Sequence, residues 1–189
     1  MEITCYGNTS FYIKGKKASL ALNPVKAMPS ASIALYSISP HEVSEAKHVI
    51  DWPGEYEVSE VFLTGTEVPF GDKKTILYSF ILDEMKVLYL PNLDHMLSEE
   101  VMEKIGDADI VLLPVGGNGV FDAKMAAKMV EEVDPKVVIP MQHSEGGFEP
   151  VSSFLKEVGK TGLGSEPSVL LEKSKLPIDA TEFHVLEVK

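Results

Sequence analysis

The chain has 189 residues and a formal net charge of −12, with 17 lysines, 29 acidic residues and no arginine. Its length and its apolar share of 44% favour one domain spanning residues 1–189. The sequence lacks the run of about 20 apolar residues that a membrane-spanning helix needs. A nucleic-acid surface needs a basic patch, so binding to nucleic acid or to a membrane is not expected. A lone cysteine, Cys5, and a polar N-terminus predict a cytoplasmic protein.

The first half of the sequence has the pattern of a β-meander. Short β-type runs are separated by Gly-Asn, Gly-Lys and Gly-Asp pairs, which are typical turn formers. These runs predict strands at 2–6, 10–14, 18–23, 32–37, 47–50, 56–68, 74–82 and 85–90.

After residue 96 the apolar residues follow the helical period. The spacing predicts helices at 98–106, 122–134 and 150–159, with Ser98 and Asp122 as caps. Two unbroken apolar runs flank the second helix, and a strand–helix–strand unit of this kind gives parallel, buried strands. The four remaining strands are predicted at 110–115, 137–141, 168–171 and 183–188.

Four loops that follow buried strands collect the polar residues of a candidate site. The loops lie at 37–42, 91–95, 116–119 and 142–147. Ligands of open α/β sheets bind outside the carboxyl ends of the parallel strands, so we expect these loops to converge. The candidate cleft residues are His41, Glu42, Asn92, Asp94, His95, Asn118, Gln142 and His143.

The spacing of these residues argues against a strong metal centre. A zinc hydrolase needs three or more protein ligands on each metal, and a bridging carboxylate where there are two metals. Two candidate pairs are adjacent in sequence, so both members cannot easily face one ion, and the amides are weak ligands. No metal or other cofactor is therefore expected. The alternative that stays open is one zinc ion held by His41, Asp94, His95 and His143.

Two other features have a structural interpretation. The Gly-Gly-Asn-Gly run at 116–119 is interpreted as a tight turn, because no P-loop lysine follows it and Asp122 would repel phosphate. Cys5 is expected in the core. Self-association of the chain would require an exposed apolar patch, for which the region around Trp52 and Tyr56 is the candidate.

Five stretches carry a family resemblance. They are ITCYGNTSFYIKGKKASLALNP, IDWPGEYEVSEVFLTGTEVP, MKVLYLPNLDHMLSEE, IGDADIVLLPVGGNGVFDAKMAAKMV and DPKVVIPMQHSEGGFEPVSSFLKEVG. With them the whole chain resembles the metallo-β-lactamase fold, particularly the small cytoplasmic Zn-dependent hydrolases related to L-ascorbate-6-phosphate lactonase. The resemblance implies a four-layer αββα sandwich with mixed sheets, and metal-dependent hydrolysis at the edge where the loops converge.

The departures from the family pattern fall on the metal ligands. The family's first metal loop, His-x-His-x-Asp-His, corresponds to 37–43, which keeps only two candidates in shifted register. The resemblance places the metal-bridging Asp at Asn92 and a ligating His at Gln142, with His143 one position later. The scaffold is therefore expected to be kept and the dinuclear centre to be degraded.

Three functions remain open after this comparison. The first is a non-catalytic relative that binds a small molecule or a protein, including a second copy of itself. The second is a metal-dependent hydrolase with a rearranged, mononuclear site. The third is metal-independent acid/base chemistry with Glu42 or His143 as the base.

Overall fold

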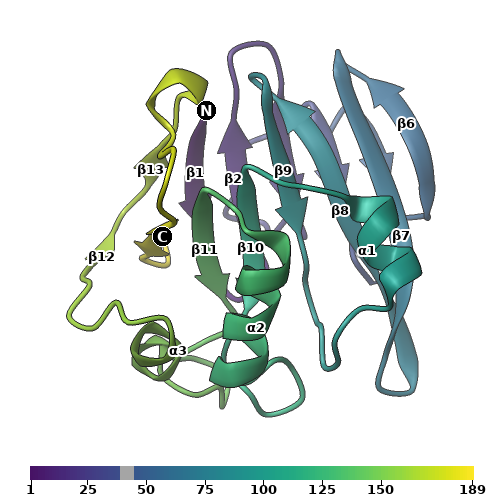
Figure 1. The fold of residues 1–189 in the computed structure, drawn as a ribbon. Helices are drawn as coiled ribbons and strands as arrows, with labels where there is room; N and C mark the ends of the chain where they lie inside the picture. The colour runs from purple at the N-terminus through teal and green to yellow at the C-terminus, as the bar shows by residue number, and fades with distance from the viewer. Residues whose placement is uncertain (39–44) are drawn as a thin grey trace.

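A computed structural model describes residues 1–38 and 45–189, so the predictions for His41 and Glu42 lie outside the described residues. Two large mixed sheets face each other, and three α-helices cover the outer face of one of them (Figure 1). This sandwich of two mixed sheets confirms the expected fold class, although among the described residues the α-helices cover one outer face, whereas the four-layer αββα order implies both.

The first sheet has six strands in the order β13-β1-β2-β3-β4-β5. β1, β2 and β3 form the predicted antiparallel meander, whereas β4 and β5 join β3 in parallel. The strands are β1 (Glu2–Cys5), β2 (Phe11–Lys14), β3 (Ser19–Leu22), β4 (Ile33–Leu35), β5 (His48–Ile50) and β13 (Val169–Leu170).

The second sheet has seven strands in the order β14-β11-β10-β9-β8-β7-β6. The predicted parallel pairing of β10 with β11 is confirmed, and β9 joins β10 in parallel on the other side. The strands are β6 (Gly54–Val58), β7 (Val61–Phe70), β8 (Lys73–Leu82), β9 (Met85–Tyr89), β10 (Ile110–Pro114), β11 (Val137–Met141) and β14 (Glu182–Phe183); β12 (Ser165–Glu166) and β15 (Val185–Leu186) pair separately.

The helices begin at the predicted caps. The Ser98 side chain accepts a hydrogen bond from the Val101 amide, and the Asp122 carboxylate accepts one from the Met125 amide at 2.9 Å. The helices are α1 (Glu99–Ile105), α2 (Ala123–Val133) and α3 (Val151–Glu157), followed by the 3₁₀ turn η1 (Lys173–Lys175).

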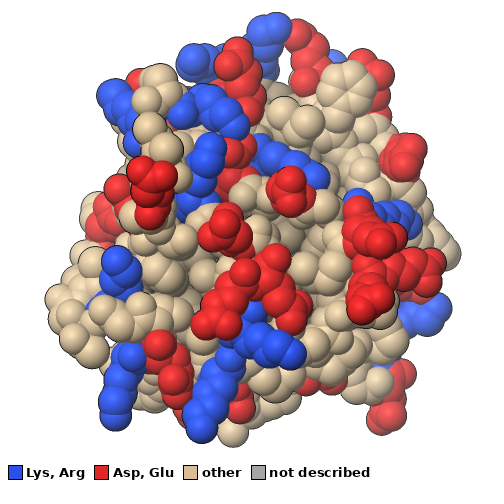
Figure 2. Space-filling model, in the orientation of Figure 1, with Lys and Arg blue, Asp and Glu red and all other residues tan. Residues whose placement is uncertain are grey.

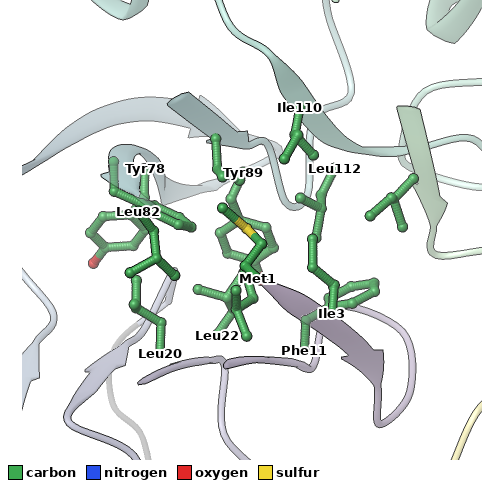
Figure 3. Close-up of a cluster of buried hydrophobic side chains, with 14 of the residues drawn as sticks. Met1, Ile3, Phe11, Leu20, Leu22, Tyr78, Leu82, Tyr89, Ile110 and Leu112 are labelled. Carbon is green, nitrogen blue, oxygen red and sulfur yellow. The ribbon is translucent and has the colours of Figure 1, made fainter. Parts of the chain in front are cut away.

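Two apolar layers hold the sandwich together. One fills the space between the sheets, where Tyr78 and Tyr89 lie fully buried among aliphatic side chains (Figure 3). The other lies between the seven-stranded sheet and the helices, and includes Phe121 and Phe154. Cys5 belongs to the first layer, as expected. The parallel strands whose carboxyl ends lead into the candidate loops are therefore packed against an apolar layer on each face.

Two predicted strands, at 183–188 and at 56–68, are each divided in two by the structure; the first becomes β14 and β15, which belong to different sheets. β6 ends at Val58, and β7 begins at Val61 after a turn through Ser59 and Glu60, with φ of 50° and 61°. A two-residue hairpin turn with positive φ normally contains Gly or Asn, and neither residue is present here. Because neither Gly nor Asn interrupts it at 59–60, the alternation of apolar and polar residues through β6 and β7 predicts one continuous strand.

The outer surface carries both kinds of charge. Lysine and acidic side chains alternate over the face that bears the helices (Figure 2). Among the described residues, no helix is both long and apolar enough to cross a membrane.

Candidate functional site

A buried amide pair lies where two of the candidate loops meet. Asn92 follows β9 and Gln142 follows β11. The two residues are only 8% and 6% exposed, respectively. Both have left-handed backbone conformations, with φ of 59° and 51°. Such conformations are costly for residues other than glycine and are kept where surrounding contacts hold them. Here these contacts include the bonds between the two residues and the bond that the Gln142 amide donates to the Asn8 carbonyl at 3.2 Å.

Asn92 and Gln142 bond to each other in both directions. The Gln142 Oε1 atom accepts from the Asn92 backbone amide at 2.9 Å, and the Gln142 Nε2 group donates to Asn92 Oδ1 at 2.9 Å. Each amide oxygen is thus already used as an acceptor inside the protein. These two bonds hold the two loops together at this point.

The Asn92–Gln142 pair contacts the first candidate loop at Ser37, which is also bonded to Asn23. The Asn92 Nδ2 group lies 3.4 Å from Ser37 Oγ and 3.5 Å from Thr75 Oγ1, which are long contacts. Ser37 is held more firmly by Asn23: its amide donates to Asn23 Oδ1 at 2.8 Å, and its Oγ lies 2.8 Å from Asn23 Nδ2. The described end of the 37–42 loop therefore belongs to the same network.

Tyr89 also belongs to the same hydrogen-bonded network. Its hydroxyl donates to the Thr9 carbonyl at 2.7 Å and lies 2.8 Å from Asn23 Nδ2. Burial raises the pKa of Tyr89 well above its ordinary value, although the hydrogen bond with Thr9 opposes the shift. The phenol is therefore a neutral hydrogen-bonding group at any physiological pH.

Asp94 and His95 contact each other and a neighbouring hairpin, and they belong to a separate set of contacts. Asp94 Oδ1 lies 2.5 Å from His95 Nδ1, and Asp94 Oδ2 accepts from the Gly71 amide at 2.9 Å. Burial opposes ionisation of Asp94, but these hydrogen bonds outweigh it and lower the pKa of the carboxyl. The carboxylate thus fastens the 91–95 loop to the β7–β8 turn.

His143 is half-buried in the fourth loop. Its Nδ1 atom lies 3.0 Å from Ser144 Oγ, and burial lowers the pKa of the imidazole below the ordinary value. Ser144 Oγ also lies 3.4 Å from the Val151 amide at the start of α3. The pair joins the loop to the start of the helix.

Loss of stability at mildly acidic pH should follow from His143. Because its folded pKa is lowered, the unfolded chain binds more protons over the interval up to about 6.5, the ordinary His value. Its contribution is complete above that pH and is lost as pH falls through the folded pKa. Urea unfolding between pH 8 and 5 should show this loss, which His143→Gln should reduce. An equal loss in that variant would contradict the assignment.

The third loop brings its backbone against Gln142. Gly116 packs so closely that an added Cβ atom would lie 2.1 Å from the Gln142 carbonyl oxygen and 2.6 Å from Phe148 Cβ. The Asn118 side-chain amide donates to the Gly147 carbonyl. The 116–119 run is a turn closed by a bond from the Val120 amide to the Gly117 carbonyl, as interpreted from the sequence.

The structure thus brings the described parts of all four loops to one edge, but not the candidate side chains to one point. Within residues 1–38 and 45–189, no group of three or more His, Cys, Asp or Glu side chains is placed to hold a metal ion. Asn92 and Gln142 meet, Asp94 and His95 form a separate pair, and Asn118 and His143 serve loop contacts. Sequence reasoning missed Thr9, Asn23, Thr75 and Tyr89, whose strand and turn positions gave no sign of a shared polar network.

Comparison with known proteins identifies the family. Residues 2–142 match the family described as the beta-lactamase superfamily domain. The chain belongs to the metallo-β-lactamase superfamily. A crystal structure from Thermotoga maritima, described as a Zn-dependent hydrolase of this superfamily, is 27% identical with a TM-score of 0.82, and the match covers 98% of this chain and 99% of that one. The novel metallo hydrolase Igni18 of Ignicoccus hospitalis, 14% identical with a TM-score of 0.68 over 90% of this chain and 99% of that one, shares the fold.

Curated relatives of this superfamily member match over a shorter stretch. A UPF0173 metal-dependent hydrolase of Methanopyrus kandleri is 33% identical over 75 residues, 38% of this chain and 32% of that protein. A second one, from Pyrococcus abyssi, is 35% identical over 71 residues, 38% of this chain and 30% of that protein. The matched part thus spans about a third of the length of these relatives.

Proposed function

We propose that this metallo-β-lactamase-fold protein has lost its dinuclear metal site and serves as a non-catalytic binding protein for a small molecule or a protein. The observation that carries the proposal is the reciprocal bond between Asn92 and Gln142. The resemblance puts a bridging carboxylate at the first position and an imidazole at the second. Neutral amides that satisfy each other replace both.

The donor set of the described loops does not fit a pair of divalent cations. A bridging carboxylate supplies negative charge to both metals, whereas an amide supplies none and coordinates weakly. Asn92 Oδ1 and Gln142 Oε1 each accept one hydrogen bond already, which leaves one lone pair on each neutral oxygen. Asp94, the nearest carboxylate in sequence, is bonded to Gly71 and His95. Each of these contacts favours a metal-free edge.

The alternative is a metal-dependent hydrolase with a mononuclear site from His41, Asp94, His95 and His143. The observation in its favour is that the relatives above are described as metal-dependent or Zn-dependent hydrolases. Its difficulty is that Asp94 and His143 are engaged with different neighbours, the β7–β8 turn and the start of α3.

Metal content separates the two functions. We expect protein purified without a metal-affinity tag, from medium supplemented with zinc, to contain less than about 0.1 zinc, iron or manganese per chain by elemental analysis. A four-ligand site of the kind above should instead retain about one ion per chain.

The matched variants are His143→Ala and His184→Ala. If the wild-type protein held one ion that His143→Ala lost and His184→Ala kept, the proposal would be wrong and the mononuclear alternative correct. His184 is a suitable control because it lies beside Glu166 in the β12–β15 region, outside the four loops.

A further inference from the structure

A cavity lies at the end of the sandwich opposite the candidate site. It has a volume of about 580 Å³ and opens between the turns that join β2 to β3, β6 to β7 and β8 to β9. The segment 171–174 forms its fourth side. The candidate loops instead follow the carboxyl ends of β4, β9, β10 and β11. The cavity and the candidate site therefore lie at opposite ends of the strands.

The floor of the cavity is apolar. It is formed by the buried ends of the interlayer core, and Ile81 stands 48% exposed beside the opening. A volume of several hundred Å³ over an apolar floor lies in the range of sites for small organic molecules. The apolar floor residues are Met1, Ala18, Val61, Leu82, Met85 and Leu171.

Three charged side chains of the rim have oppositely charged partners. Lys17 Nζ lies 2.5 Å from Glu60 Oε2, Glu172 Oε1 lies 2.7 Å from Lys175 Nζ, and Lys173 Nζ lies 2.7 Å from Asp109 Oδ2. Lys16 and Glu84 also line the cavity, so its rim carries charges of both signs and offers no patch of a single sign to an anion or a cation. The rim therefore favours an uncharged ligand.

One buried carboxylate gives the cavity wall a fixed polar point. The Asp83 side chain is 7% exposed, and its two oxygens lie 3.0 and 3.2 Å from the Lys16 backbone nitrogen, which donates to them. Asp83 Oδ2 also lies 3.2 Å from the Met1 amino group. These contacts join the two sheets at the mouth and hold the opening in one shape. A carboxylate can accept a further hydrogen bond from a ligand N–H or O–H group.

We propose that this cavity binds an uncharged, mostly apolar small molecule that carries a hydrogen-bond donor. The assignment goes beyond the proposed function and does not depend on the metal content of the opposite edge. It places binding on the part of the sandwich where the described structure provides volume, an apolar floor and a buried acceptor.

The dye N-phenyl-1-naphthylamine is a suitable probe, because it is neutral, aromatic and carries one N–H group. Titration of the full chain with this dye should give saturable fluorescence. Ala18→Leu, which fills the floor, should weaken binding at least about tenfold. Ala21→Leu is the matched control, since Ala21 is equally buried but lines a different cavity beside residues 24–31. It should leave the affinity unchanged within about twofold.

Two further measurements keep the proposal falsifiable if Ala18→Leu does not fold. The anionic analogue 8-anilinonaphthalene-1-sulfonate should bind at least about tenfold more weakly than the neutral dye. In wild-type protein, dye-induced amide shifts should gather at residues 15–18, 59–61, 82–85 and 171–174. Equal or tighter binding of the sulfonate, or shifts centred on 91–95 and 142–147, would overturn the proposal.

Discussion

Gly116→Ala should lower the free energy of unfolding by about 3 kcal/mol or more, because a β-carbon has no room at this position. The added atom would lie 2.1 Å from the Gln142 carbonyl oxygen, which belongs to the backbone and cannot rotate away. It would also meet Phe148 Cβ at 2.6 Å. To accommodate it, the loop after β11 must move, and the Asn92–Gln142 pair must move with it. Urea unfolding monitored by circular dichroism measures the loss.

Gly164→Ala is the control for this experiment. Gly164 has nothing within 4 Å of the Cβ position and, like Gly116, does not have a left-handed backbone. Its substitution should change stability by no more than about 0.5 kcal/mol. If Gly116→Ala were equally mild, the close packing of the third and fourth loops would be refuted.

Gln142→Leu should cost about 2–4 kcal/mol, because it leaves two buried polar groups of Asn92 without their partner. The groups are the Asn92 backbone amide and Asn92 Oδ1, each of which now bonds to Gln142 at 2.9 Å. Leucine has a similar size and meets the same left-handed backbone, so the loss reports the hydrogen bonds rather than a cavity. Thermal and urea unfolding of the same variant should agree on its size.

A double-mutant cycle isolates the contact itself. Asn92→Ala combined with Gln142→Leu should be less destabilising than the sum of the two single changes, with a coupling of about 0.5–3 kcal/mol. Asn118→Ala is the matched control, since Asn118 has a similar φ of 51° but is exposed and bonds to Gly147. An additive cycle would mean that the two amides do not stabilise each other.

Local sequence patterns predicted most of the secondary structure, because each element depends on nearby residues. Ser98 and Asp122 cap helices wherever those helices pack, and the two apolar runs before Val115 and Gln142 form parallel strands as expected. One exception is the break between β14 and β15 inside the predicted strand 183–188, and another is the Ser59-Glu60 turn, whose residues give no turn signal. Only the pairing of β6 with β7 fixes that turn, and pairing is a tertiary property.

The candidate site was predictable in place but less so in composition. The topology of parallel strands brings their following loops to one edge, and this needs no knowledge of side chains. The contacts within that edge depend on distant partners: Tyr89 reaches Thr9 across 80 positions, and Asn92 reaches Gln142 across 50. Spacing in the sequence therefore predicted few metal ligands, but it did not predict the hydrogen-bonded network among the described loop residues.

Cys5 carries the chain's only thiol, and the reactivity of this thiol can report when the segment around Val188 separates from β1. It is 7% exposed, and burial raises its pKa, so alkylating reagents should react slowly with the native state. Its carbonyl accepts from the Lys189 amide at 3.1 Å, and its backbone bridges to Val188. Rapid labelling therefore requires release of the chain terminus from β1. The rate of alkylation by iodoacetamide would measure this local release separately from global unfolding.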